Sequence, residues 1–135
     1  MTIFLVDSNV LLDVITDDPN WADWSQEQLD IASRDGDLVI NPVIYAEVSF
    51  AYASVEDLDA GLTAVGLELL EIPRSALFLA AAAFRLYRRR GGTRTSVLPD
   101  FFIGAHAAVV GMTLVTRDLR RHGWFPTVQV ISPGG

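Results

Sequence analysis

The chain opens with Thr2-Ile3-Phe4-Leu5-Val6, which is followed directly by Asp7-Ser8-Asn9. The first stretch is short, apolar and partly β-branched, and polar residues bound it, as is typical of a strand buried on both faces. Apolar residues then resume at Val10-Leu11-Leu12 and, after Asp13, at Val14-Ile15. The opening therefore predicts a strand followed by a short helix, with Asp7 at the carboxyl end of the strand.

The alternation of strand and helix continues to the end of the chain. Further strands are expected at residues 38–40, 67–72, 112–115 and 128–131. Further helices are expected at residues 21–33, after Asn41-Pro42, after Ser54, at 74–90, at 96–111 and briefly after Asp118. Asn41 and Ser54 are residue types that cap the start of a helix. The pattern predicts an α/β fold: one domain over residues 1–135, with a mostly parallel sheet of about five strands covered on both faces.

The composition limits the possible cofactors and locations. Half of the 135 residues are hydrophobic and none is cysteine, so a metal would be bound through oxygen or imidazole. No basic and apolar leader opens the chain, and the apolar run at residues 101–115 is shorter than the ~20 residues of a membrane-spanning helix. We therefore expect a cytoplasmic protein with no membrane partner.

The formal net charge of −7 argues against a nucleic-acid partner unless cations gather locally. All ten basic residues are arginine, whose planar guanidinium suits phosphate. The candidates for contact with the phosphates of such a partner are Arg88, Arg89, Arg90, Arg94, Arg117, Arg120 and Arg121. The alternatives are a solvated helix end for the first four and a salt bridge to a neighbouring acid for the last three.

Four acids stand in apolar or tightly structured segments: Asp7, Glu47, Asp100 and Asp118. Two of them follow predicted strands and two lie in the first or second turns of predicted helices. Asp7, Asp100 and Asp118, each taken alone, have an ordinary explanation as a cap, turn or dipole-favoured residue. Glu47 does not fit such an explanation as well, because a glutamate on an apolar helix face is rarely buried without a partner. Carboxylates buried together need raised pKa values or a hard cation, and oxygen ligands favour Mg²⁺ or Mn²⁺. Such a site would suit hydrolysis of a phosphodiester bond.

Four motifs stand out along the chain. They are Phe4-Leu5-Val6-Asp7-Ser8-Asn9-Val10-Leu11-Leu12, Asn41-Pro42-Val43-Ile44-Tyr45-Ala46-Glu47-Val48, Leu98-Pro99-Asp100-Phe101-Phe102-Ile103-Gly104-Ala105-His106-Ala107, and Leu114-Val115-Thr116-Arg117-Asp118 with Phe125-Pro126 and Val130-Ile131-Ser132-Pro133. These motifs resemble those of PIN-domain ribonucleases, in the same order and across essentially the whole chain. A chain of this length most resembles the VapC toxins of type II toxin–antitoxin pairs.

The resemblance implies a three-layer α/β/α sandwich and a Mg²⁺- or Mn²⁺-dependent endoribonuclease. It further implies tRNA or rRNA as the substrate, inhibition by a VapB-type antitoxin, and a homodimer. The catalytic and metal-binding residues would be Asp7, Glu47, Asp100 and Asp118, of which Asp7 and Asp100 would be the principal ligands. Asn9 and Thr116 would support these acids as polar neighbours.

Two other classes of protein are alternatives. Haloacid-dehalogenase-like phosphatases and response-regulator receivers also carry an Asp after the first strand, but both need a lysine and this chain has none. The phosphatases also need a second Asp at the position of Asn9. The remaining alternative is a non-catalytic PIN module that binds RNA or protein. Loss of one or more of the four acids would indicate such a module, and all four are present.

Three further residues have open interpretations. His106 is expected to pack or to form a hydrogen bond rather than to bind a ligand. Trp21 and Trp24 are expected either to dock an antitoxin or to join the core.

Overall fold

The computed structural model describes residues 1–118 and 123–134. Within these ranges the strands are β1 (Thr2–Val6), β2 (Gly36–Ile40), β3 (Leu67–Leu69), β4 (Thr113–Val115) and β5 (Val130–Ile131). The helices are α1 (Ser8–Ile15), α2 (Ala22–Asp35), α3 (Pro42–Ser49), α4 (Val55–Val65), α5 (Arg74–Arg89) and α6 (Leu98–Val110). None of these helices is long and apolar enough to cross a membrane.

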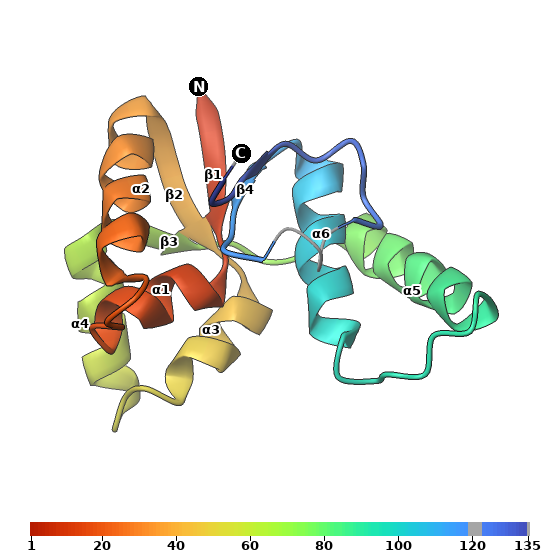
Figure 1. Ribbon diagram of the computed structural model, residues 1–135, viewed down its shortest axis with the longest axis horizontal. Helices are drawn as coiled ribbons and strands as arrows, with labels where there is room; N and C mark the ends of the chain where they lie inside the picture. The colour runs from red at the N-terminus through yellow and green to blue at the C-terminus, as the bar shows by residue number, and fades with distance from the viewer. Residues whose placement is uncertain (119–122, 135) are drawn as a thin grey trace.

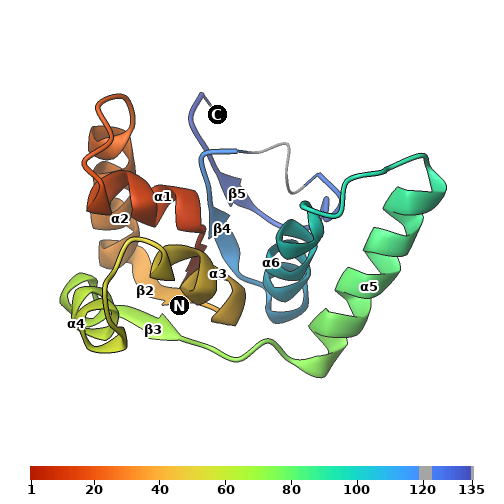
Figure 2. The same cartoon turned by 90° about the horizontal axis from the view of Figure 1, so that it is seen from below.

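The strands form one sheet in the order β3-β2-β1-β4-β5, and each described pairing is parallel. Leu5 of β1 pairs with Val39 on one side and with Leu114 on the other. Helices α1 and α2 lie on one side of the sheet, and α5 and α6 lie on the other (Figures 1 and 2). The predicted three-layer α/β/α fold is therefore confirmed.

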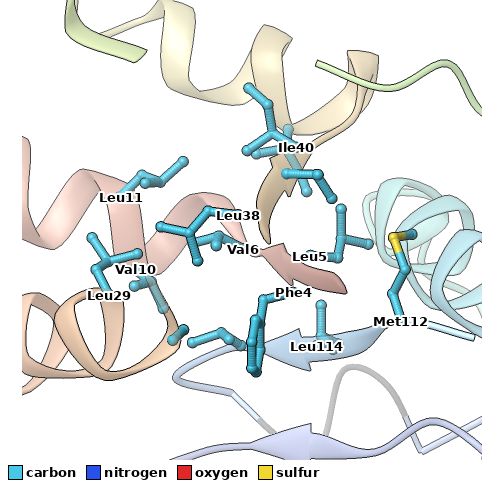
Figure 3. Close-up of a cluster of buried hydrophobic side chains, with 14 of the residues drawn as sticks. Phe4, Leu5, Val6, Val10, Leu11, Leu29, Leu38, Ile40, Met112 and Leu114 are labelled. Carbon is cyan, nitrogen blue, oxygen red and sulfur yellow. The ribbon is translucent and has the colours of Figure 1, made fainter. Parts of the chain in front are cut away.

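The main core is built around β1. Leu5 and Val6 are fully buried, and side chains from neighbouring elements pack around them, including Leu11 of α1, Ile40 of β2 and Leu114 of β4 (Figure 3). Burying a side chain of this size stabilises the fold by roughly 1.5–3 kcal/mol. A second cluster, between α5 and α6, contains the buried rings of Phe101 and Phe125. Asp7 follows β1, the central strand of the main core, and Asp100 lies in α6 next to Phe101 of the second cluster.

Local signals set several helix ends as the sequence predicts. The Asn41 side chain accepts a hydrogen bond from the Ile44 amide at the start of α3, and the Ser54 hydroxyl accepts one from the Asp57 amide at the start of α4. Helix α6 ends at Gly111, whose φ of 80° is left-handed. Glycine adopts this conformation without the steric cost that a Cβ brings.

Strand β2 begins two residues earlier than predicted, at Gly36 rather than Leu38. The predicted extents of two other strands are too long. Strand β3 covers Leu67–Leu69 rather than 67–72, and β5 covers Val130–Ile131 rather than 128–131. Both are edge strands that pair on one side only, and the chain leaves β3 to reach α5 across the molecule (Figure 2). The short helix predicted after Asp118 falls mainly on residues 119–122, outside the described residues.

The strand order changes direction at β1. Strands β2 and β3 lie on one side of it, whereas β4 and β5 lie on the other. Ligand sites of open parallel sheets lie beyond the carboxyl ends of the strands at such a switch point. Asp7 directly follows β1, and Thr116 directly follows β4, so the fold brings both to this edge of the sheet.

Candidate functional site

Asp7 lies at the centre of the candidate site and has no exposed surface. Its amide donates to the Val115 carbonyl at 2.9 Å, which joins the end of β1 to the end of β4. Its carboxylate accepts a hydrogen bond from the Ser8 amide at 2.8 Å, capping α1, and one from the Thr116 hydroxyl at 2.8 Å. The end of β4 therefore fixes the backbone of Asp7, and Ser8 and Thr116 fix the orientation of its carboxylate.

The Thr116 hydroxyl connects three parts of the site. It donates to Oδ2 of Asp7 and accepts from the Asn9 side-chain amide at 3.2 Å and from the Asp118 backbone amide at 3.2 Å. Nδ2 of Asn9 also lies 3.5 Å from Oδ2 of Asp7. Asn9 and Thr116 thus contact Asp7 as polar neighbours, and their support of a metal-binding acid stays a prediction.

Glu47 reaches the site through a serine that the sequence analysis missed. The Ser8 hydroxyl donates to Oε1 of Glu47 at 3.0 Å and lies 3.5 Å from Oδ1 of Asp7. Ser8 is buried, while Glu47 is half-buried in the second turn of α3. The sequence does contain a signal for this role of Ser8, because its hydroxyl directly follows Asp7 at the end of the first strand.

Asp100 and Asp118 line the same cavity, which has a volume of about 630 Å³. Asp100 lies in the first turn of α6 and is 5% exposed, whereas Asp118 is half-buried. The cavity is also lined by Tyr87, Arg94, Ser96, Val97, Phe101 and Trp124. Two of the predicted acids therefore line one cavity, whose volume is in the range of small-molecule sites.

The four acids are connected in pairs. Ser8 links Asp7 to Glu47, Thr116 links Asp7 to the backbone of Asp118, and the cavity joins Asp118 to Asp100. Among residues 1–118 and 123–134, no group of three or more His, Asp or Glu side chains is gathered closely enough to hold a metal ion. The donors are all hard oxygens, which are the ligands that Mg²⁺ and Mn²⁺ prefer. The donor chemistry fits such an ion, and the ligand set remains a prediction.

Arg117 forms an ion pair that the sequence analysis left as an alternative. Its Nε donates to Oδ2 of Asp13 at 2.8 Å and its Nη2 donates to Oδ1 at 3.0 Å. The guanidinium also lies over the ring of Trp21, with Cζ 5.2 Å from the ring centroid. The hydrogen bonds to the Asp13 carboxylate raise the pKa of Arg117 above its ordinary value. This side chain is directed toward α1 and α2.

The sequence analysis did not single out Asp13, which holds the Arg117 side chain. It is 3% exposed and accepts a third hydrogen bond, from the Ser25 hydroxyl at 2.8 Å. The signal was present in the sequence, because Asp13 interrupts the apolar run of α1 in the same way that Glu47 interrupts that of α3. Its partner lies 104 positions away along the chain, so the pairing itself had no local signature.

The other candidate arginines occupy different places. Arg94 lines the cavity beside Asp100, whereas Arg88 lies over the ring of Phe84 and Arg90 lies over the ring of Trp124. Arg89 is exposed at the end of α5. Arg120 and Arg121 lie outside the described residues. Contact between any of these arginines and RNA remains a prediction.

His106 is buried in α6, and its Nδ1 lies 3.2 Å from Nδ2 of Asn41. The Asn41 oxygen already accepts from the Ile44 amide, so the amino group of Asn41 faces the imidazole. Nδ1 therefore accepts this hydrogen bond, and the neutral imidazole carries its proton on Nε2. The expectation that His106 packs and forms a hydrogen bond is confirmed.

We expect protonation of His106 to destabilise the fold. Burial lowers the pKa of His106 from its ordinary value of 6.5, so the unfolded chain takes up this proton first as the pH falls. The free energy of unfolding should then decrease below about pH 6.5, by up to ~1.4 kcal/mol per pH unit until the folded imidazole also titrates. Urea unfolding between pH 7.5 and 5.5 would measure this slope. The slope should be shallower in His106→Gln, and equal slopes would contradict the expectation.

The two tryptophans of the second helical region are partly buried. Their rings meet edge to face, with centroids 6.2 Å apart. Trp24 packs against the main core, and Trp21 packs against Arg117. The core interpretation therefore holds for Trp24, while docking of an antitoxin at either residue stays a prediction.

The fold and this site define an α/β protein with an acidic site at the switch point of a parallel sheet. The sequence matches the PIN domain family model over residues 4–123. The chain belongs to the PIN domain family. No match to the sequence was found among curated proteins.

Solved structures of toxin–antitoxin complexes share the fold. VapBC2 from Rickettsia felis, bound to a DNA fragment from its promoter, contains a chain of 17% identity with a TM-score of 0.74, and the match covers 97% of this chain and 98% of that one. DNA-bound VapBC from Salmonella typhimurium gives 20% identity, a TM-score of 0.72 and 98% coverage of both chains. A toxin–antitoxin complex from Klebsiella pneumoniae gives 19% identity, a TM-score of 0.70 and 98% coverage of both chains. At sequence identities this low, the likeness shows that these chains share a fold.

Proposed function

We propose that this protein is an endoribonuclease that depends on Mg²⁺ or Mn²⁺ and hydrolyses phosphodiester bonds of RNA. The observation that carries the proposal is the position of Asp7, a fully buried carboxylate at the switch point, oriented by the same Thr116 hydroxyl that accepts from the Asp118 amide. Asp118 in turn lines a cavity with Asp100. Membership of the PIN domain family supports the same chemistry.

We assign the roles of the acids from the resemblance of their motifs to those of the family. Asp7 and Asp100 would hold the ion, and Glu47 and Asp118 would complete the acidic pocket. A bound divalent ion would supply an activated water and neutralise charge on the scissile phosphate. The hydroxyls of Ser8 and Thr116 hold the carboxylates in place, which limits the reorganisation needed when substrate enters.

We further propose that the protein acts in the cytoplasm as the toxin of a VapBC-type pair, inhibited by a VapB-type antitoxin and assembling as a homodimer. The support is the near-complete coverage, in both directions, of chains from VapBC complexes. The candidate substrates are tRNA and rRNA, as the family resemblance implies.

Incubation of purified protein, free of antitoxin, with total tRNA and rRNA tests the activity. We expect discrete cleavage products with Mg²⁺ or Mn²⁺, none with EDTA, and recovery when the metal is restored. Sequencing of the product ends would identify the target. RNA that stays intact while binding equally well in EDTA would contradict the proposal and favour a non-catalytic RNA-binding module.

A further inference from the structure

The segment that carries Asp118 leaves the sheet soon after β4. The Thr116 amide donates to the Ile131 carbonyl at 3.0 Å, which continues the pairing of β4 with β5 by one residue. The next amide, that of Arg117, donates instead to Oδ1 of Asn9 at 3.1 Å. After Thr116, side-chain contacts therefore take over from the sheet in holding the backbone that leads to Asp118.

One face of α1 provides these contacts. Asn9 and Asp13 are four positions apart, so they project from the same side of the helix. Nδ2 of Asn9 donates to the Thr116 hydroxyl at 3.2 Å. Asp13 accepts two hydrogen bonds from the Arg117 guanidinium, at 2.8 and 3.0 Å. Helix α1 thus holds Arg117 twice, by its backbone amide and by the far end of its side chain.

The surroundings of the ion pair leave the Arg117 guanidinium one arrangement. The guanidinium lies over the Trp21 ring, with Cζ 5.2 Å from the centroid. Asp13 is 3% exposed and is itself fixed by the Ser25 hydroxyl, which donates to it at 2.8 Å. Apolar side chains of similar volume often stabilise a fold as well as a buried ion pair does, whereas the paired hydrogen bonds of a carboxylate and a guanidinium fix geometry. The pair therefore suits a role in placing the segment that it holds.

Arg117 directly precedes Asp118, which lines the 630 Å³ cavity with Asp100. We propose that Asp13 is a positioning residue of the candidate metal site: it fixes Arg117, and through the backbone of Arg117 it fixes Asp118 in the cavity. The proposal rests on the proposed nuclease function, because it takes Asp118 as one of the acids of the metal pocket. It adds to that function a buried carboxylate that acts without contacting the ion or the RNA.

Binding of Mn²⁺ in the absence of RNA tests the proposal, and electron paramagnetic resonance of the unbound ion measures the dissociation constant. The variants are Asp13→Asn and Arg117→Met, each of which breaks the ion pair from one side. We expect each to weaken Mn²⁺ binding roughly tenfold, as is usual for residues that orient metal ligands. A purely electrostatic effect would have opposite signs, because removing the guanidinium charge would favour a nearby cation. Tighter or unchanged binding by a folded Arg117→Met protein would overturn the proposal.

The same two substitutions in an Asp118→Asn protein show whether their effect passes through Asp118. We expect neither to weaken Mn²⁺ binding further in that background, because the carboxylate that they position is absent. Losses that add fully to that of Asp118→Asn would overturn the proposal. Unchanged Mn²⁺ affinity in a folded Asp13→Asn protein, or no Mn²⁺ binding by the wild type, would overturn it as well.

Leu62→Ala is the control for loss of stability. Leu62 is a buried side chain of the main core in α4, a helix that packs against β3, on the opposite side of β1 from β4. Its truncation should destabilise the fold, as truncation of a core leucine does, and leave Mn²⁺ affinity unchanged. Thermal melts would set a temperature at which all variants are folded. If Leu62→Ala weakens Mn²⁺ binding as much as Asp13→Asn does, the effect reflects stability and the proposal is wrong.

Cleavage of RNA in Mg²⁺ separates this proposal from the proposed function. If the wild type cleaves RNA and the two substitutions leave Mn²⁺ affinity unchanged, the nuclease proposal stands and the positioning role is wrong. If the substitutions weaken Mn²⁺ binding only while Asp118 is present but the wild type cleaves no RNA, the positioning role stands and the nuclease proposal is wrong.

Discussion

Replacing Asp7 with Asn is expected to slow RNA cleavage roughly a thousandfold, which corresponds to the loss of several kcal/mol of transition-state stabilisation. The amide has nearly the shape of the carboxylate, and its oxygen can still accept from the Ser8 amide at the start of α1. The loss would therefore come from the missing charge. Asp100→Asn should act in the same direction. Single-turnover cleavage of the RNA identified from the pool would measure both.

Asp37→Asn provides the control for these substitutions. Asp37 is an exposed carboxylate near the amino end of β2, at the opposite end of the sheet from the site. It should leave the rate unchanged, and circular dichroism melts should show that all three variants are folded. A folded Asp7→Asn protein that keeps more than a tenth of the wild-type rate would remove Asp7 from the catalytic residues.

Replacing Asp13 with Asn is expected to lower the free energy of unfolding by about 3 kcal/mol, because it breaks a buried ion pair and leaves one charge without its partner. Asp13 is 3% exposed and accepts two hydrogen bonds from Arg117 and one from Ser25. The side chain of Arg117 is 31% exposed, so solvent offsets part of the cost and the lower end of the usual range applies. The midpoint of thermal unfolding should fall by roughly 10 °C.

Urea unfolding at pH 7 measures the loss, with Asp37→Asn again as the control that should change stability by less than about 0.5 kcal/mol. Adding Arg117→Met to Asp13→Asn should restore part of the stability, since the remaining charge is then removed as well. If Asp13→Asn costs no more than the control, the ion pair does not stabilise the fold.

The positions of the arginines show why the net charge is a weak argument against a nucleic-acid partner. Arg117 is engaged by Asp13, and Arg88 and Arg90 lie over aromatic rings. Within the described residues, Arg94 is the candidate that lines the cavity with the acids. A local arrangement of a few cations beside an acidic pocket is compatible with a chain whose overall charge is −7.

Two of the predicted acids illustrate what local sequence can reveal. Asp7 was placed correctly because a buried strand and a helix start are both short-range patterns, and the residue between them must lie at the strand's carboxyl end. Glu47 was placed in the second turn of α3 because Asn41 and Pro42 mark where that helix begins. Local propensity and hydrogen bonding within a few residues determine such features.

The sequence by itself determined the order of the elements, the parallel α/β fold and the positions of Asp7, Glu47 and Asp100 within them. The tertiary structure decided which side chains meet: Ser8 with Glu47, Thr116 with Asp7, and Asp13 with Arg117. Partners separated by 39 to 109 positions leave no periodic signal in the sequence. The contacts of Thr116 and Arg117 arise only when the strand order places β4 beside β1, and the contact of Ser8 with Glu47 arises when α1 packs against α3. Both arrangements are properties of the whole packed fold.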